Sequence, residues 1–260
     1  HDICTVSTNN EIKIKKLLDL HVPGTVILAS WLDKNGFSYD LQQRYKKSGW
    51  LESIGVGAFK RPNDNIGWQG AVYSLQQQAN LSVHVGGLSA LSLLGYSHYI
   101  RTGVETVYLF SKLKTKLPAW FEKYFWSEPI NHTKTSFLPT EKGLEENSVG
   151  TFQIKIASPE RSILECLYLA PEKQDLLETY QIMSGLVNLR PDILQALLNE
   201  CKSVKVKRLF LYMLKKANHQ WGQFLDLSEV NLGTGDREIV KNGIYDSEFH
   251  ITVPKELAQI

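Results

Sequence analysis

The N-terminal part of the chain alternates short apolar runs with turn residues, a pattern that predicts short helices. Apolar positions recur at helical spacing from Asn10 to Leu20, and Pro23 and Gly24 end that segment. Thr25 is a suitable N-cap for a second helix over 26–33, which Gly36 would end because glycine accepts a positive φ. The pattern therefore predicts two consecutive helices before residue 37.

A third helix and a hairpin are expected next. Ser38 is a suitable N-cap for a helix over 39–48, whose inner face would carry Leu41 and Tyr45 at i, i+4 spacing. The following segment, WLESIGVGAFKRP, alternates apolar and small residues, bends at its glycines and ends at Pro62. It predicts a short β-hairpin.

The rest of the chain continues as a mixture of helices and strands, which makes the expected fold class α+β. Ser158, Pro159 and Glu160 form a strong helix start of cap, proline and first-turn carboxylate. Helices are expected at about 68–78, 85–94, 160–168, 175–185, 191–202 and 204–217, and strands near 106–110, 151–156, 238–241 and 249–253. The charged segment 141–150 is expected to be a solvated loop. A domain break near Gly95 divides the chain into 1–94 and 95–260.

The charge of the chain is informative about function only where basic residues cluster locally. The net charge is +2, and 95–260 holds equal numbers of acidic and basic residues, so the bulk balance excludes nothing. A nucleic-acid footprint needs one charged face rather than a charged protein. Basic residues do cluster in the third helix, after the hairpin, and from Lys202 to Lys216, where six occur with no acidic residue between them.

The strongest constellation is helix, turn, helix and glycine-containing hairpin, the order of a winged helix-turn-helix. The second helix of such a pair enters the major groove, and the wing contacts the DNA backbone or the minor groove. Glutamine and arginine read adenine and guanine, while hydroxyls and lysines bind phosphate. The bland alternative is a solvated helix beside a hairpin. The candidate DNA-binding residues are Ser38, Tyr39, Gln42, Gln43, Arg44, Lys46, Lys47, Lys60 and Arg61.

The helix expected over 204–217 is basic and amphipathic. On a helical wheel its cations, with Lys202, occupy one sector opposite an apolar face. One interpretation is a packed helix with a solvated face. The others are a nucleic-acid contact or a surface that recognises the RNA or nucleotide substrate of another protein. The residues of this sector are Lys202, Lys205, Arg208, Lys215 and Lys216.

Longer strings carry a family resemblance. The run GTVILASWLDKNGFSYDLQQRYKKSGWLESIGVGAFKRP resembles the winged helix of AbiE-type antitoxins, the regulators of type IV toxin-antitoxin systems. IKIASPERSILECLYLAP, SGLVNLRPDILQALLNECKSVKVKRLFLYMLKKA and IVKNGIYDSEFHITVP are similar to that family's C-terminal antitoxin domain in order and spacing. Because many regulators share a winged helix, the C-terminal strings carry the assignment.

The resemblance implies a protein with two roles and no enzymatic activity. The winged helix would repress the operon by binding repeats in its operator DNA. The C-terminal antitoxin domain would counteract a nucleotidyltransferase toxin without requiring a stable complex, in a system linked to abortive infection and phage defence. The basic sector of the helix over 204–217 would then be an antitoxic surface that recognises the toxin's RNA or nucleotide substrate. No cofactor, metal or membrane is expected, and the expected location is the cytoplasm.

Two alternatives stay open. A transcription factor with a small-molecule-sensing C-terminal domain would be favoured by an apolar pocket with convergent polar groups in that domain. A DNA-tethered nuclease would need converging carboxylates. Pro191, Asp192, Glu200 and Lys202 form a loose PD…ExK string, but on one helix the two carboxylates would lie about 12 Å apart along the axis. Three widely spaced cysteines, Cys4 among them, suit reduced thiols.

Overall fold

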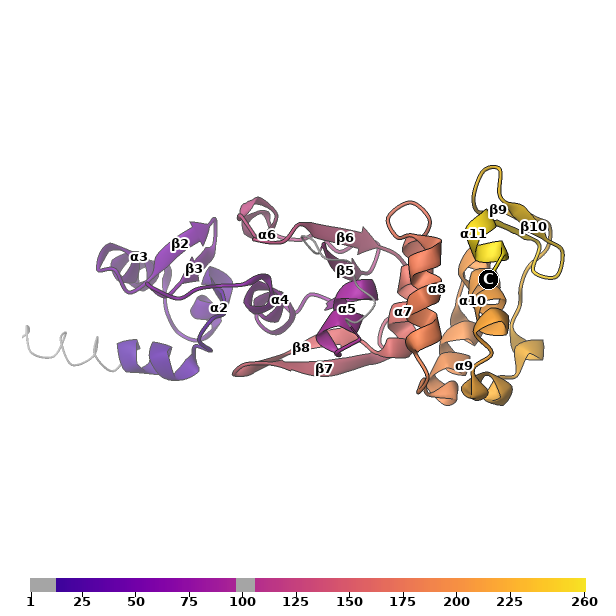
Figure 1. Cartoon of the computed structure of the whole chain (residues 1–260). Coiled ribbons are helices and arrows are strands. Elements are labelled where there is room, and N and C mark those ends of the chain that lie inside the picture. Colours follow the sequence, from indigo (N-terminus) through magenta and orange to yellow (C-terminus); the bar gives the residue numbers. More distant parts are fainter. Residues whose placement is uncertain (1–12, 97–105) are drawn as a thin grey trace, which may run out of the picture. The chain divides into compact units, whose positions relative to one another are not determined.

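The computed structural model describes residues 13–96 and 106–260, which form two compact units (Figure 1). Unit 1 comprises the chain up to Leu81 together with 116–127 and 148–154, and unit 2 comprises 82–115, 128–147 and 155–260. The chain therefore enters unit 2 before the break expected near Gly95. Each unit is built around its own elements and is described by itself.

Unit 1 begins with a helical segment over 13–20 and a small sheet framing two helices. The remainder of the helix expected from Asn10, and Cys4, lie outside the described residues. The elements are β1 (Ile27–Leu28), α2 (Ala29–Lys34), α3 (Tyr39–Lys47), β2 (Glu52–Gly55) and β3 (Ala58–Lys60), and the sheet order is β1-β3-β2.

The prediction of one helix over 26–33 was partly wrong, because its first residues form β1. Ile27 and Leu28 pair with Phe59 and Ala58 of β3. A short, wholly apolar run fits a buried strand as well as a helix. The third helix and the hairpin are confirmed by α3 and by β2–β3. The core beneath them consists of Leu17, Ile27, Leu32, Phe37, Leu41, Tyr45, Leu51 and Phe59.

Two more helices complete unit 1, α4 (Trp68–Gln77) and α6 (Ala119–Lys123). Gly70 of α4 approaches the backbone so closely that a Cβ there would lie 1.9 Å from the carbonyl oxygen of Gly24. The side chains of Ser74 and Gln78 both donate to the carbonyl oxygen of Val26. The helix is therefore anchored to the chain that leads into β1.

Unit 2 is built on a five-stranded mixed sheet in the order β6-β5-β4-β8-β7, with strand ends that belong to unit 1. β4 pairs antiparallel with β5 and parallel with β8, and β5 pairs parallel with β6. The strands are β4 (Val83–Val85), β5 (Val107–Ser111), β6 (Ile130–Lys134), β7 (Leu144–Val149) and β8 (Phe152–Ala157). The segment 141–150 was expected to be a loop, but most of it forms the strand β7. This strand lies at the edge of the sheet, and its polar sequence has no apolar stripe that would have indicated a strand.

Five of the described helices of unit 2 match their predicted ranges to within two residues, and a short helix over 255–258 was not predicted. Ser158 caps α7, accepting from the backbone N–H of Arg161, with Pro159 in the first turn. The helices are α5 (Gly87–Leu93), α7 (Pro159–Leu169), α8 (Leu176–Gly185), α9 (Pro191–Glu200), α10 (Val204–Ala217) and α11 (Lys255–Ala258).

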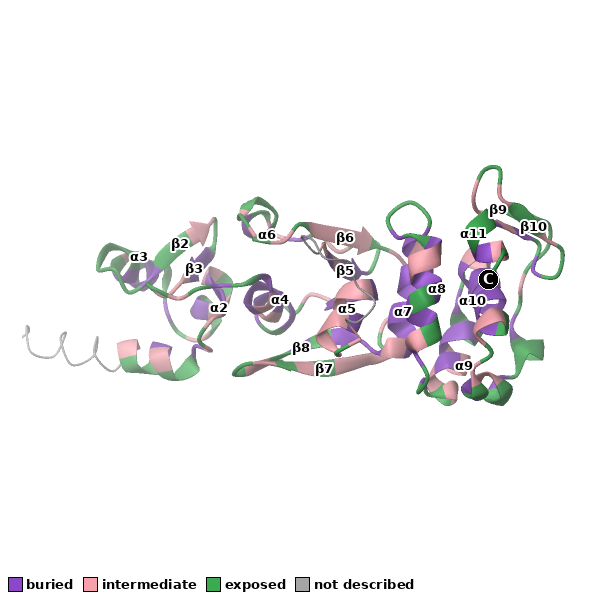
Figure 2. Cartoon of the chain, viewed as in Figure 1, coloured by how far each residue is buried: buried purple, intermediate pink, exposed green. Residues whose placement is uncertain are grey.

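A three-stranded sheet accompanies the C-terminal helices in unit 2. β11 lies between β10 and β9, antiparallel to the first and parallel to the second. Its strands are β9 (Arg237–Glu238), β10 (Ile244–Asp246) and β11 (Ile251–Val253). α10 is largely buried among these elements (Figure 2).

Two cysteines of unit 2 are free and buried, Cys166 and Cys201. Burial raises the pKa of both thiols, which keeps them protonated and unreactive at neutral pH. Their free thiols agree with the expectation from the sequence.

Candidate nucleic-acid interface

Helix α3 has one buried face and one exposed face (Figure 2). Leu41 and Tyr45 are each 2 % exposed and pack into the core of unit 1, as the i, i+4 spacing predicted. Burial raises the pKa of the Tyr45 phenol, and its hydroxyl finds no hydrogen-bond partner among the described residues. The inward face is therefore committed to packing.

Gln42 belongs to that inward face, so its assignment as a base-reading residue was wrong. Its side chain is 3 % exposed, and its Nε2 donates to the carbonyl oxygens of Phe37 at 2.8 Å and Ala29 at 3.1 Å. These bonds tie α3 to the preceding turn and to the start of α2. Burying an amide costs desolvation free energy, which hydrogen bonds to the amide offset. The two bonds explain why glutamine is accommodated there.

The outward face of α3 carries most of the other candidates. Ser38, Tyr39, Arg44, Lys46 and Lys47 are exposed, and Gln43 is half-buried beside them. Within 13–96 and 106–260, no carboxylate forms an ion pair with Arg44, Lys46 or Lys47. We call the set of Gln43, Arg44, Lys46 and Lys47 the α3 face. It presents free positive charge beside one amide.

The cations of the hairpin next to α3 are less available to a ligand than those of α3. Lys60 Nζ lies 3.4 Å from Glu52 Oε2 and donates to the carbonyl oxygen of Asp64 at 3.3 Å, so part of its charge is neutralised within the hairpin. Arg61 is half-buried. The turn is made by Val56, which is 91 % exposed, and Gly57, whose φ of +75° favours glycine.

The cations of α10 lie differently, and the outward direction expected for Arg208 was wrong. Arg208 is 2 % exposed, and its guanidinium donates to the carbonyl oxygens of Leu232, Gly235 and His250. These acceptors belong to the segment that precedes β9 and to the turn before β11. Arg208 therefore holds the C-terminal segment onto α10.

Other cations of α10 are also engaged. Lys205 is half-buried and donates to the carbonyl oxygens of Tyr168 and Ala170, and desolvation lowers the pKa of its amine. Lys216 donates to the carbonyl oxygen of Ala258 at 3.2 Å. Lys215 is exposed but forms an ion pair with Glu248. The helix is consequently a structural element more than a basic surface.

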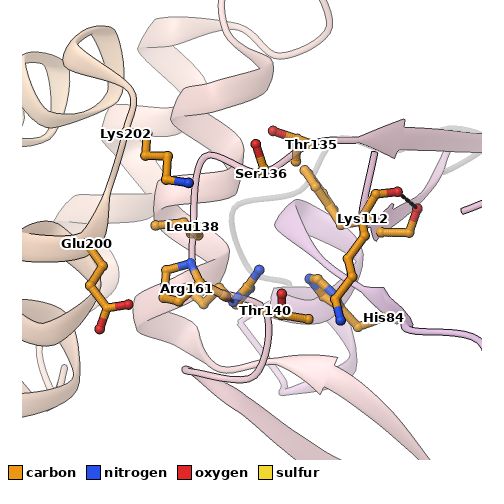
Figure 3. Close-up of a pocket in the computed structure, with 12 residues that line it drawn as sticks. His84, Lys112, Thr135, Ser136, Leu138, Thr140, Arg161, Glu200 and Lys202 are labelled. Atoms are coloured by element: carbon orange, nitrogen blue, oxygen red, sulfur yellow. Dashed lines mark hydrogen bonds between the residues drawn. The ribbon is translucent and has the colours of Figure 1, made fainter. Parts of the chain in front are cut away.

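Lys202 lies before α10, at the rim of a polar pocket inside unit 2 that the sequence did not indicate as a whole (Figure 3). Beneath the pocket, the carboxylate of Glu165 accepts from His84 Nε2 at 2.7 Å, Arg161 Nε at 2.8 Å and the backbone N–H of Gly87 at 3.0 Å. Although burial raises the pKa of Glu165, the charges of His84 and Arg161 outweigh it and lower the pKa below its usual value.

One part of this cluster was visible in the sequence. Arg161 and Glu165 stand four residues apart on a predicted helix, a spacing that favours an ion pair. His84 is a buried residue whose Nε2 bonds to Glu165. Their meeting at one site depends on the pairing of β4 with the sheet, which no local pattern predicts.

The loose PD…ExK string does not gather into one site. Asp192 lies in the first turn of α9 and Glu200 at its last residue. Glu200 forms an ion pair with Lys142. In the part of the chain that the structure describes, no group of three or more metal-ligating side chains is placed to hold an ion.

Comparison with known families defines the class of this protein. The family of the AbiEi antitoxin N-terminal domain, a transcriptional regulator, matches residues 10–102. The family described as the AbiEi antitoxin, a transcriptional regulator of type IV toxin-antitoxin systems, matches residues 104–254. The chain belongs to the AbiEi antitoxin family, as the resemblance of its sequence indicated.

A solved structure shares the fold. The crystal structure of the RV2827C protein from Mycobacterium tuberculosis matches with a TM-score of 0.58 at 14 % identity, covering 92 % of this chain and 88 % of that one. No curated protein matches the sequence. Among the described helices, none is both long and apolar enough to cross a membrane.

Proposed function

We propose that unit 1 is a winged helix-turn-helix that binds operator DNA, with α3 as the recognition helix and β2–β3 as the wing. The observation that carries the proposal is the α3 face, whose three cations are exposed and unpaired among the described residues. Cations in the last turn also stabilise a helix through its dipole, but the phosphates and base edges of DNA would supply direct partners for all three. Family membership supports the same role.

In this arrangement Gln43 and Arg44 read base edges from the outward side of α3, Gln43 at its middle and Arg44 in its last turn. Lys46 and Lys47 contact phosphates, as do Ser38 and Tyr39 near the helix start. Lys60 and Arg61 contribute less than their charge suggests, because Lys60 is shared with Glu52 and Asp64 and Arg61 is half-buried.

The protein represses its own operon by binding repeats in the promoter, and it counteracts a nucleotidyltransferase toxin without requiring a stable complex. The DNA-binding role belongs to the N-terminal part of the chain and the antitoxic role to the C-terminal part. Lys205 and Arg208 each make two or more hydrogen bonds to backbone carbonyl oxygens. The antitoxic contribution of the basic sector therefore falls to Lys202, to Lys215, whose ion pair is exposed, and to Lys216, which makes a single such bond. We place the protein in the cytoplasm.

The test of DNA binding is a salt titration of the full chain on promoter DNA. Two lysine–phosphate contacts predict a logarithmic slope near −1.8, or roughly 12-fold weaker binding between about 50 and 200 mM salt. A slope near zero would contradict the proposal.

Variants then separate the roles within the α3 face. Arg44→Ala should cost about 1–3 kcal/mol on promoter DNA and much less on random DNA. Lys47→Ala should weaken both to the same extent and make the salt slope shallower by about 1. Lys241→Ala, an exposed lysine of unit 2, is the matched control and should change neither. Equal losses for Arg44→Ala on both DNAs would remove it from base reading.

The antitoxic role is tested by co-expression with the cognate nucleotidyltransferase toxin. The full chain should rescue growth, and the double variant Lys215→Ala/Lys216→Ala should rescue less. Full rescue by that variant, with unchanged thermal stability, would exclude these lysines from the antitoxic mechanism.

A further inference from the structure

The pocket of unit 2 has a volume of about 210 Å³ and lies within this one unit. It is smaller than the roughly 300–1,000 Å³ of pockets that enclose drug-sized ligands. A small ion, or the end group of a larger molecule, fits such a volume. Its chemistry therefore has to be inferred from the groups that line it.

Nitrogen atoms with unused hydrogen-bonding capacity converge there. Arg161 is 4 % exposed; its Nε donates to Glu165 and its Nη1 to the carbonyl oxygens of Pro139 and Lys142. Its Nη2 has no partner among the described residues and is not sealed from solvent. The same holds for Nδ1 of His84, which is 6 % exposed. Both side chains line the pocket.

Two lysines add positive charge to the pocket. Lys112 follows β5 and Lys202 follows α9, and Figure 3 shows their side chains extending over the pocket from opposite sides. Neither amine has a carboxylate partner in the described part of the chain. The carboxylate of Glu200, which also lines the pocket, is neutralised by Lys142. The site consequently carries an excess of positive charge.

Hydroxyl groups stand beside these cations. Ser136 and Thr140 line the pocket on the segment between β6 and β7, and neither side chain forms a hydrogen bond with another described residue. A guanidinium, two ammonium groups and free hydroxyls suit a tetrahedral anion with several acceptor oxygens. A single carboxylate would leave some of these donors unused.

We propose that this pocket binds a phosphoryl group, supplied by free inorganic phosphate or by the phosphate end of a nucleotide. Arg161 is held rigid from below by Glu165 and from the side by two carbonyl oxygens, so its free Nη2 is already oriented. Lys112 and Lys202 close over the anion from the two sides of the pocket. The proposal does not depend on DNA binding by unit 1.

The test is isothermal titration of the full chain at constant ionic strength with inorganic phosphate and, separately, with nucleoside triphosphates. Saturable binding of either supports the proposal. Similar affinities for both identify free phosphate as the ligand, and binding of the nucleotides alone identifies a nucleotide. Absence of binding of both at about 10 mM would overturn it.

Variants locate the bound anion. Lys112→Ala/Lys202→Ala should weaken binding at least about ten-fold, because two of its charge-assisted contacts are lost. Both lysines are exposed, so the fold should persist, as thermal unfolding would verify. Thr140→Val, which replaces the hydroxyl with a methyl group of similar size, should weaken binding a few-fold, and Lys241→Ala should leave it unchanged. Unchanged binding in the double lysine variant, or an equal loss in Lys241→Ala, would overturn the assignment.

Discussion

Helices α3 and α10 are both basic and amphipathic, yet the two use their cations in opposite ways. Arg44, Lys46 and Lys47 of α3 point into solvent, whereas Arg208 and Lys205 of α10 donate to backbone carbonyl oxygens of distant segments. The spacing of charges along a helix shows which cations share a face. It does not show whether water or another part of the chain covers that face.

The comparison is tested most strongly by Arg208→Ala. Removing the guanidinium leaves three carbonyl oxygens without their donor, and we expect unfolding free energy to fall by about 3 kcal/mol or more. Arg44→Ala is the matched control and should stay within about 0.5 kcal/mol, because that side chain is exposed. Chemical denaturation of both variants measures the difference. Equal stabilities would show that Arg208 is not a structural residue.

Lys205 should give an intermediate effect. Its ammonium bonds two carbonyl oxygens but is only half-buried, so water can replace part of the interaction. We expect Lys205→Met to cost about 1–2 kcal/mol, since the apolar stem still packs. If denaturation shows no loss, the two bonds contribute nothing beyond what water supplies.

Lys215→Ala should have a smaller effect than either. Its ion pair with Glu248 is solvent-exposed at both ends. Exposed pairs contribute about 0–1 kcal/mol, and added salt should erase whatever contribution exists. Denaturation at low and high salt checks this, and a loss that persists in high salt would argue for a packing role instead.

A pH titration should distinguish the two units by their buried titratable groups. In unit 1, burial lowers the pKa of His21 despite its bond to Asp64. The unfolded chain then binds the proton more readily, so stability is full above about pH 6.5 and declines as pH falls below it. In unit 2 the pKa of Glu165 is lowered. The folding stability that its ionised carboxylate contributes should therefore decline only as the pH falls below about 4.3.

Thermal unfolding between about pH 7.5 and 5 measures the first transition. The melting temperature of the native chain should fall as the pH is lowered over this range. The slope of melting temperature against pH should be smaller in His21→Gln, because glutamine does not titrate. An unchanged slope in that variant would assign the acid sensitivity to another group.

Local sequence signals predicted α3, α7 and α10 well, because each combines a cap or turn residue with a clear apolar stripe. They failed where a strand is too short or too polar to show its period, as in β1 and β7. Among the site residues, Gln42 was misassigned because a glutamine can satisfy buried carbonyl oxygens as well as read a base.

Long-range contacts account for the other misses. The acceptors of Arg208 lie 24 to 42 residues away, and His84 lies 81 residues from Glu165. Neither separation leaves a periodic signal in the sequence. The polar pocket was therefore beyond local analysis, although several of its residues had been considered one by one.

Neither unit is a continuous stretch of the chain, because the polypeptide passes between them after residues 81, 115, 127, 147 and 154. A single break between residues 81 and 116 would leave segments of both units on the C-terminal fragment. The N-terminal fragment would lack segments with which it forms one compact unit. Two such fragments produced together should consequently reassemble, and neither should be a satisfactory substitute for the whole. We therefore predict that the two units in space do not correspond to two separable pieces of the gene.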